Sequence, residues 1–112
     1  MIFDTEKDGL HTIFRPYKAA LMEHIWEVNS ETRTGTTSGQ AHERLQKTGN
    51  EDLMMSRASV NFFFDDMVEE GVLEREEESG KGGYHGVYYP KMTREEFGQY
   101  VVSAIMEKLK TL

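Results

Sequence analysis

The sequence predicts a mostly helical α+β domain in which three helices precede a two-stranded hairpin and a closing helix. Two patterns carry this prediction. Apolar residues recur every three or four positions in separate segments of the chain, which is the spacing of amphipathic helices. Between the last two of these segments, the alternating stretch VLEREEE and the aromatic stretch YHGVYYP flank the turn-rich cluster SGKGG.

The first predicted helix starts at Pro16, since proline is favoured in the first turn of a helix. One face carries apolar side chains spaced by four, four and three residues: Tyr17, Leu21, Ile25 and Val28. Met22 and Trp26 add a second apolar stripe, so we expect this helix to be buried on two sides.

A shorter helix follows the polar loop ETRTGTT. Thr37 or Ser38 caps it, Ala41 and Leu45 form its buried face, and Gly49 ends it. The linker GNEDLMM contains two methionines, so we expect part of it to pack against the core.

The third predicted helix is the most regular, and Ser56 caps it. Its apolar side chains fall at positions i, i+3, i+4, i+7 and i+8: Val60, Phe63, Phe64, Met67 and Val68. Gly71 follows its last turn, where a glycine commonly ends a helix. Three helices followed directly by a hairpin are typical of the winged helix-turn-helix, with the third helix as recognition helix and SGKGG as the tip of the wing.

The closing helix, expected from Thr93 to Leu112, begins with a capping box formed by Thr93 and Glu96. It presents two adjacent apolar stripes, and one domain needs only one of them. We therefore predict a homodimer with this interface: Phe97, Val101, Val102, Ile105, Met106 and Leu109. We therefore predict three regions: an N-terminal arm over 1–15, a winged-helix DNA-binding domain over 16–92 and a C-terminal dimerisation helix over 93–112. The arm supplies an extra strand or part of the dimer interface.

Composition narrows the class of protein. A chain of 112 residues indicates one domain, and the absence of cysteine excludes disulfides, thiolate metal sites and cysteine nucleophiles. No apolar run reaches the ~20 residues of a membrane helix, and the start MIFDTEKDG lacks the pattern of a signal peptide, so we expect a cytoplasmic protein without membrane contact. The net charge of -7 opposes nucleic-acid binding unless the basic residues gather on one face of the protein.

Catalysis has little support in the sequence. The four histidines are scattered, and His42-Glu43 does not continue into the HExxH zinc motif. SGKGG lacks the spacing of a phosphate-binding P-loop, and no GxSxG nucleophile motif occurs. We therefore expect no enzyme activity, no metal and no cofactor.

A family resemblance spans about residues 16–112. The matching positions are Ser59-Val60, Phe63-Phe64, Met67, Glu69-Glu70-Gly71-Val72-Leu73, Tyr88-Tyr89-Pro90 and Arg94-Glu95-Glu96. This pattern resembles winged-helix repressors of the penicillinase-repressor and copper-operon-repressor type and, more broadly, the multiple-antibiotic-resistance regulators. The resemblance implies a transcriptional repressor that binds double-stranded DNA. The chain departs from the family pattern at Asp65 and Asp66, where bases are usual, and it lacks the cysteines of the copper-repressor metal site.

The predicted DNA interface follows from this arrangement. Arg57 would pair with guanine and Asn61 with adenine, while Ser56 and Ser59 would hold phosphates. Phe62 would meet a thymine methyl group or a protein partner. The second helix adds Ser38, Gln40 and Arg44, and the wing adds Lys81, Tyr84 and His85.

Two alternatives to DNA binding stay open from the sequence. One is a winged-helix module for protein–protein interaction, in which Phe62 and the acids of the third helix form the contact surface. A positive stripe through Arg57, Arg44 and Lys81 favours DNA, whereas acids interspersed among these bases favour a protein partner. The other is a ligand-responsive regulator with an apolar pocket between the first and last helices.

Overall fold

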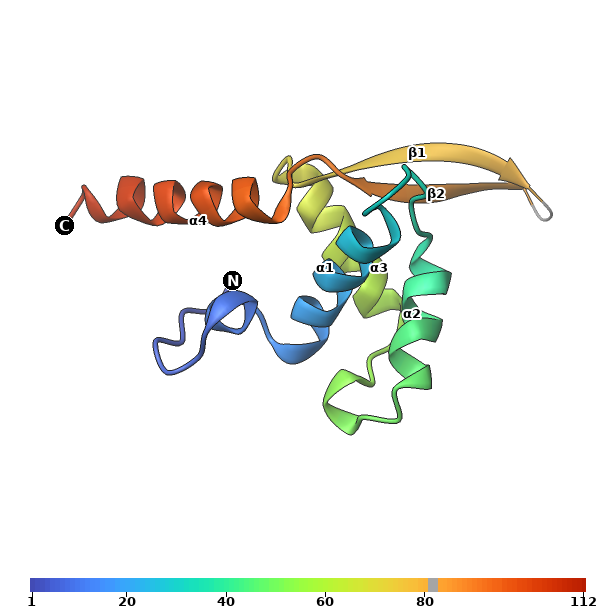
Figure 1. Ribbon diagram of the computed structural model, residues 1–112, viewed down its shortest axis with the longest axis horizontal. Coiled ribbons are helices and arrows are strands. Elements are labelled where there is room, and N and C mark those ends of the chain that lie inside the picture. The colour runs from blue at the N-terminus through green and yellow to red at the C-terminus, as the bar shows by residue number, and fades with distance from the viewer. Residues whose placement is uncertain (81–82) are drawn as a thin grey trace.

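Three helices pack around one apolar core, and a hairpin and a fourth helix extend from it in opposite directions (Figure 1). This computed structural model describes residues 1–80 and 83–112. In chain order the elements are η1 (Gly9–Thr12), α1 (Pro16–Val28), α2 (Ser38–Lys47), η2 (Glu51–Leu53), α3 (Arg57–Glu69), β1 (Leu73–Gly80), β2 (Gly83–Pro90) and α4 (Arg94–Leu109). The predicted α+β, mostly helical class is confirmed.

The core lies between α1, α2, α3 and the base of the hairpin. Helix α1 is buried on two sides, as its double stripe predicts, through Ala19, Leu21, Met22, Ile25 and Trp26. Helix α3 buries the predicted stripe except Val68, which is half-buried. In the linker between α2 and α3, η2 forms and Leu53 packs against the core, which confirms the prediction that part of this segment is packed.

Local hydrogen bonds set the helix boundaries that the sequence predicts. Thr37, and not Ser38, caps α2: the Thr37 side chain accepts a hydrogen bond from the Gln40 backbone N–H, and the Gln40 side chain accepts one from the Thr37 backbone N–H. Ser56 caps α3. Gly71 follows α3 with a φ of 81°, a conformation that glycine adopts without steric cost.

The hairpin is a two-stranded antiparallel sheet whose base is attached to the body. Its register pairs Leu73 with Pro90 and Gly80 with Gly83. Thr36, in the loop before α2, forms an isolated antiparallel bridge with Tyr88, and each residue donates its backbone N–H to the other's carbonyl. This bridge, which the sequence does not predict, fixes the base of the hairpin against the loop before α2.

Helix α4 belongs to the core only through its first turns. Phe97 and Val101 are buried, and the Trp26 indole donates a hydrogen bond across 3.0 Å to the Met92 carbonyl just before the helix. The prediction that Phe97 and Val101 belong to the dimer interface is therefore wrong, because both side chains fill the chain's own core. Beyond them α4 projects along the longest dimension of the molecule, away from the hairpin (Figure 1). The radius of gyration is 14.8 Å, against about 13 Å for a compact chain of this length.

The arm over 1–15 contains a 3-10 turn and no strand, so the expectation of an extra strand is wrong. Ile2 donates its backbone N–H to the Ile13 carbonyl and Asp4 donates to Thr12, which folds the arm back on itself. Ile13 and Phe14 are buried, and the Phe14 ring stacks on Phe97 of α4 at 5.9 Å between centroids. The arm is thus packed against the base of α4.

In the described part of the chain, 1–80 and 83–112, no helix combines the length and the apolar character needed to cross a membrane.

Candidate nucleic-acid interface

Arg57, the first residue of α3, extends its guanidinium to the first turn of α2. A Cβ atom built on Gly39 would lie only 3.1 Å from Nη2 of Arg57, so the guanidinium lies directly over the first turn of α2. The first turn of a helix carries unsatisfied N–H groups and a partial positive charge. An exposed guanidinium beside such a turn is an arrangement suited to phosphate.

The predicted contacts on α2 differ in accessibility. Ser38 is buried, with 9% of its surface exposed, so its hydroxyl is not offered to a ligand as the sequence predicts. Gln40 is exposed, but its side-chain carbonyl accepts the Thr37 N–H at 3.0 Å. Arg44 is exposed and forms an ion pair with Glu27 of α1 at 3.3 Å.

At the start of α3, Ser56 and Ser59 bond to each other. The Ser56 hydroxyl accepts the Ser59 backbone N–H at 3.1 Å and donates to the Ser59 hydroxyl at 3.0 Å. Both hydroxyls therefore lie at the amino end of α3, close in sequence to Arg57.

Farther along α3, Asn61 and Phe62 are exposed, and Phe62 has 69% of its surface exposed. The Tyr88 hydroxyl donates to Oδ1 of Asp65 at 2.7 Å and lies 3.5 Å from Oδ1 of Asn61. The shorter bond identifies Asp65 as its acceptor. Burial, with the adjacent Asp65 carboxylate, raises the pKa of Tyr88 to about 12. Asp65 thus holds the hairpin to α3.

The three predicted wing contacts are only partly described. Lys81 lies outside the described residues. Tyr84 is paired with Ser79 of β1 in the hairpin register. His85 is exposed and lies opposite Glu78 in the hairpin register.

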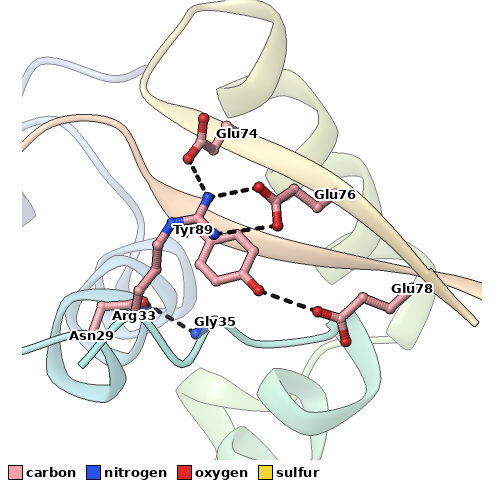
Figure 2. A network of polar contacts seen from close by, with 7 residues as sticks. All are labelled: Asn29, Arg33, Gly35, Glu74, Glu76, Glu78 and Tyr89. Atoms are coloured by element: carbon pink, nitrogen blue, oxygen red, sulfur yellow. Dashed lines mark hydrogen bonds and ion pairs between the residues drawn. The ribbon is translucent and has the colours of Figure 1, made fainter.

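Arg33, in the loop after α1, binds the base of the hairpin from the side (Figure 2). Its guanidinium donates to Glu74 at 2.6 Å and to Glu76 at 2.9 and 3.2 Å, and it lies 3.7 Å from the centre of the Tyr89 ring. The hydrogen bonds to Glu76 and then to Glu74 raise the pKa of Arg33 above its usual value, and the bond from Arg33 lowers the pKa of Glu76. The Tyr89 hydroxyl donates to Glu78 at 3.3 Å. Arg33 thereby pairs with two of the glutamates of β1, Glu74 and Glu76, and ties the loop after α1 to the hairpin.

Acidic side chains are interspersed among the basic side chains of this region. Arg44 pairs with Glu27, and Arg75 on β1 pairs with Glu77 at 2.8 Å. Among the described residues no carboxylate forms an ion pair with Arg57. Of the three basic residues whose alignment would favour DNA, Arg57 has no carboxylate partner among the described residues, Arg44 is paired with Glu27, and Lys81 lies outside the described residues.

His24 on α1 is half-buried. Its Nε2 is 3.1 Å from the Thr36 hydroxyl, which itself donates to the Thr37 carbonyl. The other ring nitrogen, Nδ1, is buried and has no partner among the described residues. Burial, followed by the charge of Arg44, lowers the pKa of His24.

A separate apolar surface lies at the other end of the molecule. Among the residues whose side chains the structure describes, the exposed large apolar ones other than Phe62 belong to the arm or to the α4 end: Met1, Ile2, Phe3, Val102, Met106, Leu109 and Leu112. Between arm and helix runs a groove of about 420 Å³ lined largely by apolar residues, among them Phe3, Leu10, Val101 and Ile105.

Comparisons with protein-family models, with curated proteins and with solved structures found no significant match to this chain.

Three residues important to this region could not be singled out from the sequence. Arg33 and Thr36 lie in a polar loop without periodicity, and their partners are more than forty positions away. Gly39 sits in the first turn of α2, and its role depends on Arg57 of the next helix. The one available signal is the glycine itself, since glycine within a helix is unfavourable and often marks close approach.

Proposed function

We propose that this chain is a winged-helix transcriptional regulator that binds double-stranded DNA in a sequence-specific manner as a homodimer and acts as a repressor. In this reading α2 and α3 form the helix-turn-helix, α3 enters the major groove, β1 and β2 form the wing, and α4 is the dimerisation helix. The protein would act in the cytoplasm, without a cofactor.

The observation that carries the proposal is the position of Arg57 over the first turn of α2. It brings an exposed guanidinium, the amino end of α2 and the hydroxyls of Ser56 and Ser59 into one small region. Asn61 and Phe62 continue from there along the outer side of α3. Phosphate groups and base edges are recognised by groups of these kinds.

The experiment is binding of the protein to a pool of short duplexes, followed by fluorescence anisotropy across a salt series. Few accessible basic side chains lie on this face, so we expect modest affinity for DNA and a shallow dependence of that affinity on salt. Arg57→Ala should weaken binding by about 1–3 kcal/mol and relax sequence preference if Arg57 reads guanine; if it contacts phosphate, the salt slope should fall by about 1.

The matched control is Lys7→Ala, which removes the same charge from an exposed position on the arm. Loss of binding in Arg57→Ala with Lys7→Ala unaffected supports the proposal. Equal effects of the two variants would mean that only overall charge matters, and the proposed face would be rejected.

The pairing of Arg44 and Arg75 with glutamates, together with the exposure of Phe62, favours a second candidate function. In this case the fold is a winged-helix module for protein–protein interaction, and α3 presents Phe62 and Asp66 to a protein. Absence of duplex binding at low salt by a folded protein would exclude the first function and leave this one.

A further inference from the structure

The exposed side of α4 carries a regular apolar seam that the chain's own core contacts only at the half-buried Ile105. Gly98, Val102, Ile105 and Leu109 follow one another at intervals of four, three and four residues. This alternation is the heptad spacing with which one helix packs along another. Val102 is 58% exposed and Leu109 is 53% exposed, so the seam is unpartnered over its outer half.

Gly98 is the least expected member of this seam. It lies inside α4, where glycine is less favourable than alanine. A Cβ atom at this position would meet nothing within 4 Å among the described residues, so the chain's own packing does not require the glycine. Close approach of another backbone or of a large side chain would require it.

The seam is complementary to itself when reversed. In an antiparallel pair centred between residues 103 and 104, Gly98 of one helix faces Leu109 of the other, and Val102 faces Ile105. The smallest seam residue thus meets a large one, and two branched residues meet at the centre. In the first turn of α4, Arg94 is paired with Glu23 of α1, which leaves the acids Glu95 and Glu96. In the last turn, Glu107 is paired with Lys110, which leaves Lys108. Antiparallel pairing places these opposite charges together.

We propose that α4 pairs antiparallel with α4 of a second copy of this chain, with Leu109 of each copy seated over Gly98 of the other, in the groove that the arm and α4 enclose. Phe3 lines the same groove and is 67% exposed, which extends the contact onto the arm. The relation is isologous, because each copy gives its helix end and receives that of its partner. This inference rests on the homodimer of the proposed function and specifies its partner surface and direction.

Cysteine cross-linking without DNA tests the direction, and the chain contains no native cysteine to interfere. Gly98→Cys and Leu109→Cys are made as separate variants and oxidised alone and as a mixture. In the antiparallel register two Gly98 positions are about 16 Å apart along the helix axis, well beyond the ~7 Å limit between Cα atoms for a disulfide. We therefore expect cross-linked dimers in the mixture and little in either variant alone.

Sedimentation measures the strength of the pair. Val102→Glu buries an unpartnered charge at the centre of the seam, so its dimer dissociation constant should rise by at least about tenfold. Ser103→Glu adds the same charge one position away from the seam and should leave that constant within about twofold of the parent's. Circular dichroism checks that both variants fold, as expected of exposed positions.

Three outcomes overturn the proposal. Cross-linking of each cysteine variant alone would indicate a parallel pair, and equal weakening by both glutamate variants would place the interface elsewhere. A parent protein that sediments as a monomer would leave the groove to a ligand or to a different protein. None of these readouts involves DNA, so failure here is distinct from failure to bind duplexes.

Discussion

The hydroxyl of Tyr88 on β2 donates a hydrogen bond to the carboxylate of Asp65 on α3 across 2.7 Å. Only 2% of Tyr88 is exposed, whereas Asp65 is exposed to solvent. The bond joins the hairpin to the helix proposed to enter DNA, and the Phe64 ring packs on the Tyr88 ring at 4.9 Å between centroids. The orientation of the hairpin therefore depends on a phenol that remains protonated.

Tyr88→Phe should lower the free energy of unfolding by about 0.5–1.5 kcal/mol, because it removes the hydrogen bond and keeps the ring. The pKa of Tyr88 in the folded protein is about 12, above its unfolded value of 10.0. The contribution is thus fully present below pH 10 and is lost as the pH rises from there through 12. Urea denaturation at pH 8 and at pH 11 measures both effects.

In Tyr88→Phe, the loss of stability between these two pH values should be smaller than in the parent protein. If parent and variant lose the same amount, the alkaline sensitivity arises from other tyrosines, and the role given to the Tyr88 proton is wrong.

Gly35→Ala should be one of the most destabilising single-methyl changes in the chain. Gly35 has a φ of 73°, and an added Cβ would lie 2.6 Å from both the Tyr89 ring and Val87. We expect a loss of about 2–5 kcal/mol, the sum of a left-handed alanine and an overpacked contact. Chemical denaturation measures the loss.

Gly49→Ala is the matched control, since Gly49 has a φ of 67° and open space around its Cβ position. It should cost only about 1–2 kcal/mol, the conformational part alone. Similar losses in the two variants would show that the loop before α2 does not press on the hairpin.

The helices and the hairpin were predictable because each is marked by a pattern of neighbouring residues in the sequence. The stripe from Val60 to Val68, the capping box at Thr93 and the glycine after α3 are all read from neighbouring residues. The contacts that orient these elements are not local. The pairs Arg33 with Glu74, Thr36 with Tyr88, and Tyr88 with Asp65 join positions that are 41, 52 and 23 residues apart, and no periodic pattern marks them.

The candidate site follows the same division. Arg57 and Phe62 could be placed on an outer face because helical spacing fixes which side of α3 they occupy. The burial of Ser38 and the pairing of Arg44 with Glu27 depend on how α2 packs against its neighbours. For α4, spacing revealed two apolar stripes, but only packing showed that Phe97 serves the core and Val102 does not.

His24 makes stability sensitive to mild acid. Burial lowers the pKa of His24 in the folded protein below its ordinary value of 6.5, and in the charged form Nδ1, which has no described partner, must also carry a proton. A depressed folded pKa means that full stability is present above about pH 6.5 and is lost as the pH falls. We expect the free energy of unfolding to decrease between pH 7 and pH 5.

His24→Gln should flatten this dependence, whereas His11→Gln, at an exposed histidine of the arm, should leave it as in the parent. Denaturation at four or five pH values in this window suffices. An unchanged slope in His24→Gln would mean that another group binds the proton on unfolding.

The three successive phenylalanines of α3 should separate binding from stability. Phe62 is 69% exposed while Phe63 is 3% exposed, because adjacent residues of a helix point in different directions. Phe63→Ala should cost about 3–5 kcal/mol of stability, whereas Phe62→Ala should stay within about 0.5 kcal/mol of the parent. Thermal and urea denaturation check both values.

Binding then decides what Phe62 contacts. If its ring meets a thymine methyl group, replacing thymine by uracil in a bound duplex should weaken binding by the parent protein. Phe62→Ala should bind both duplexes alike, at the weaker level. A variant that retains the parent's preference for thymine would show that Phe62 does not read the base, and its exposed ring would then favour the protein-interaction function.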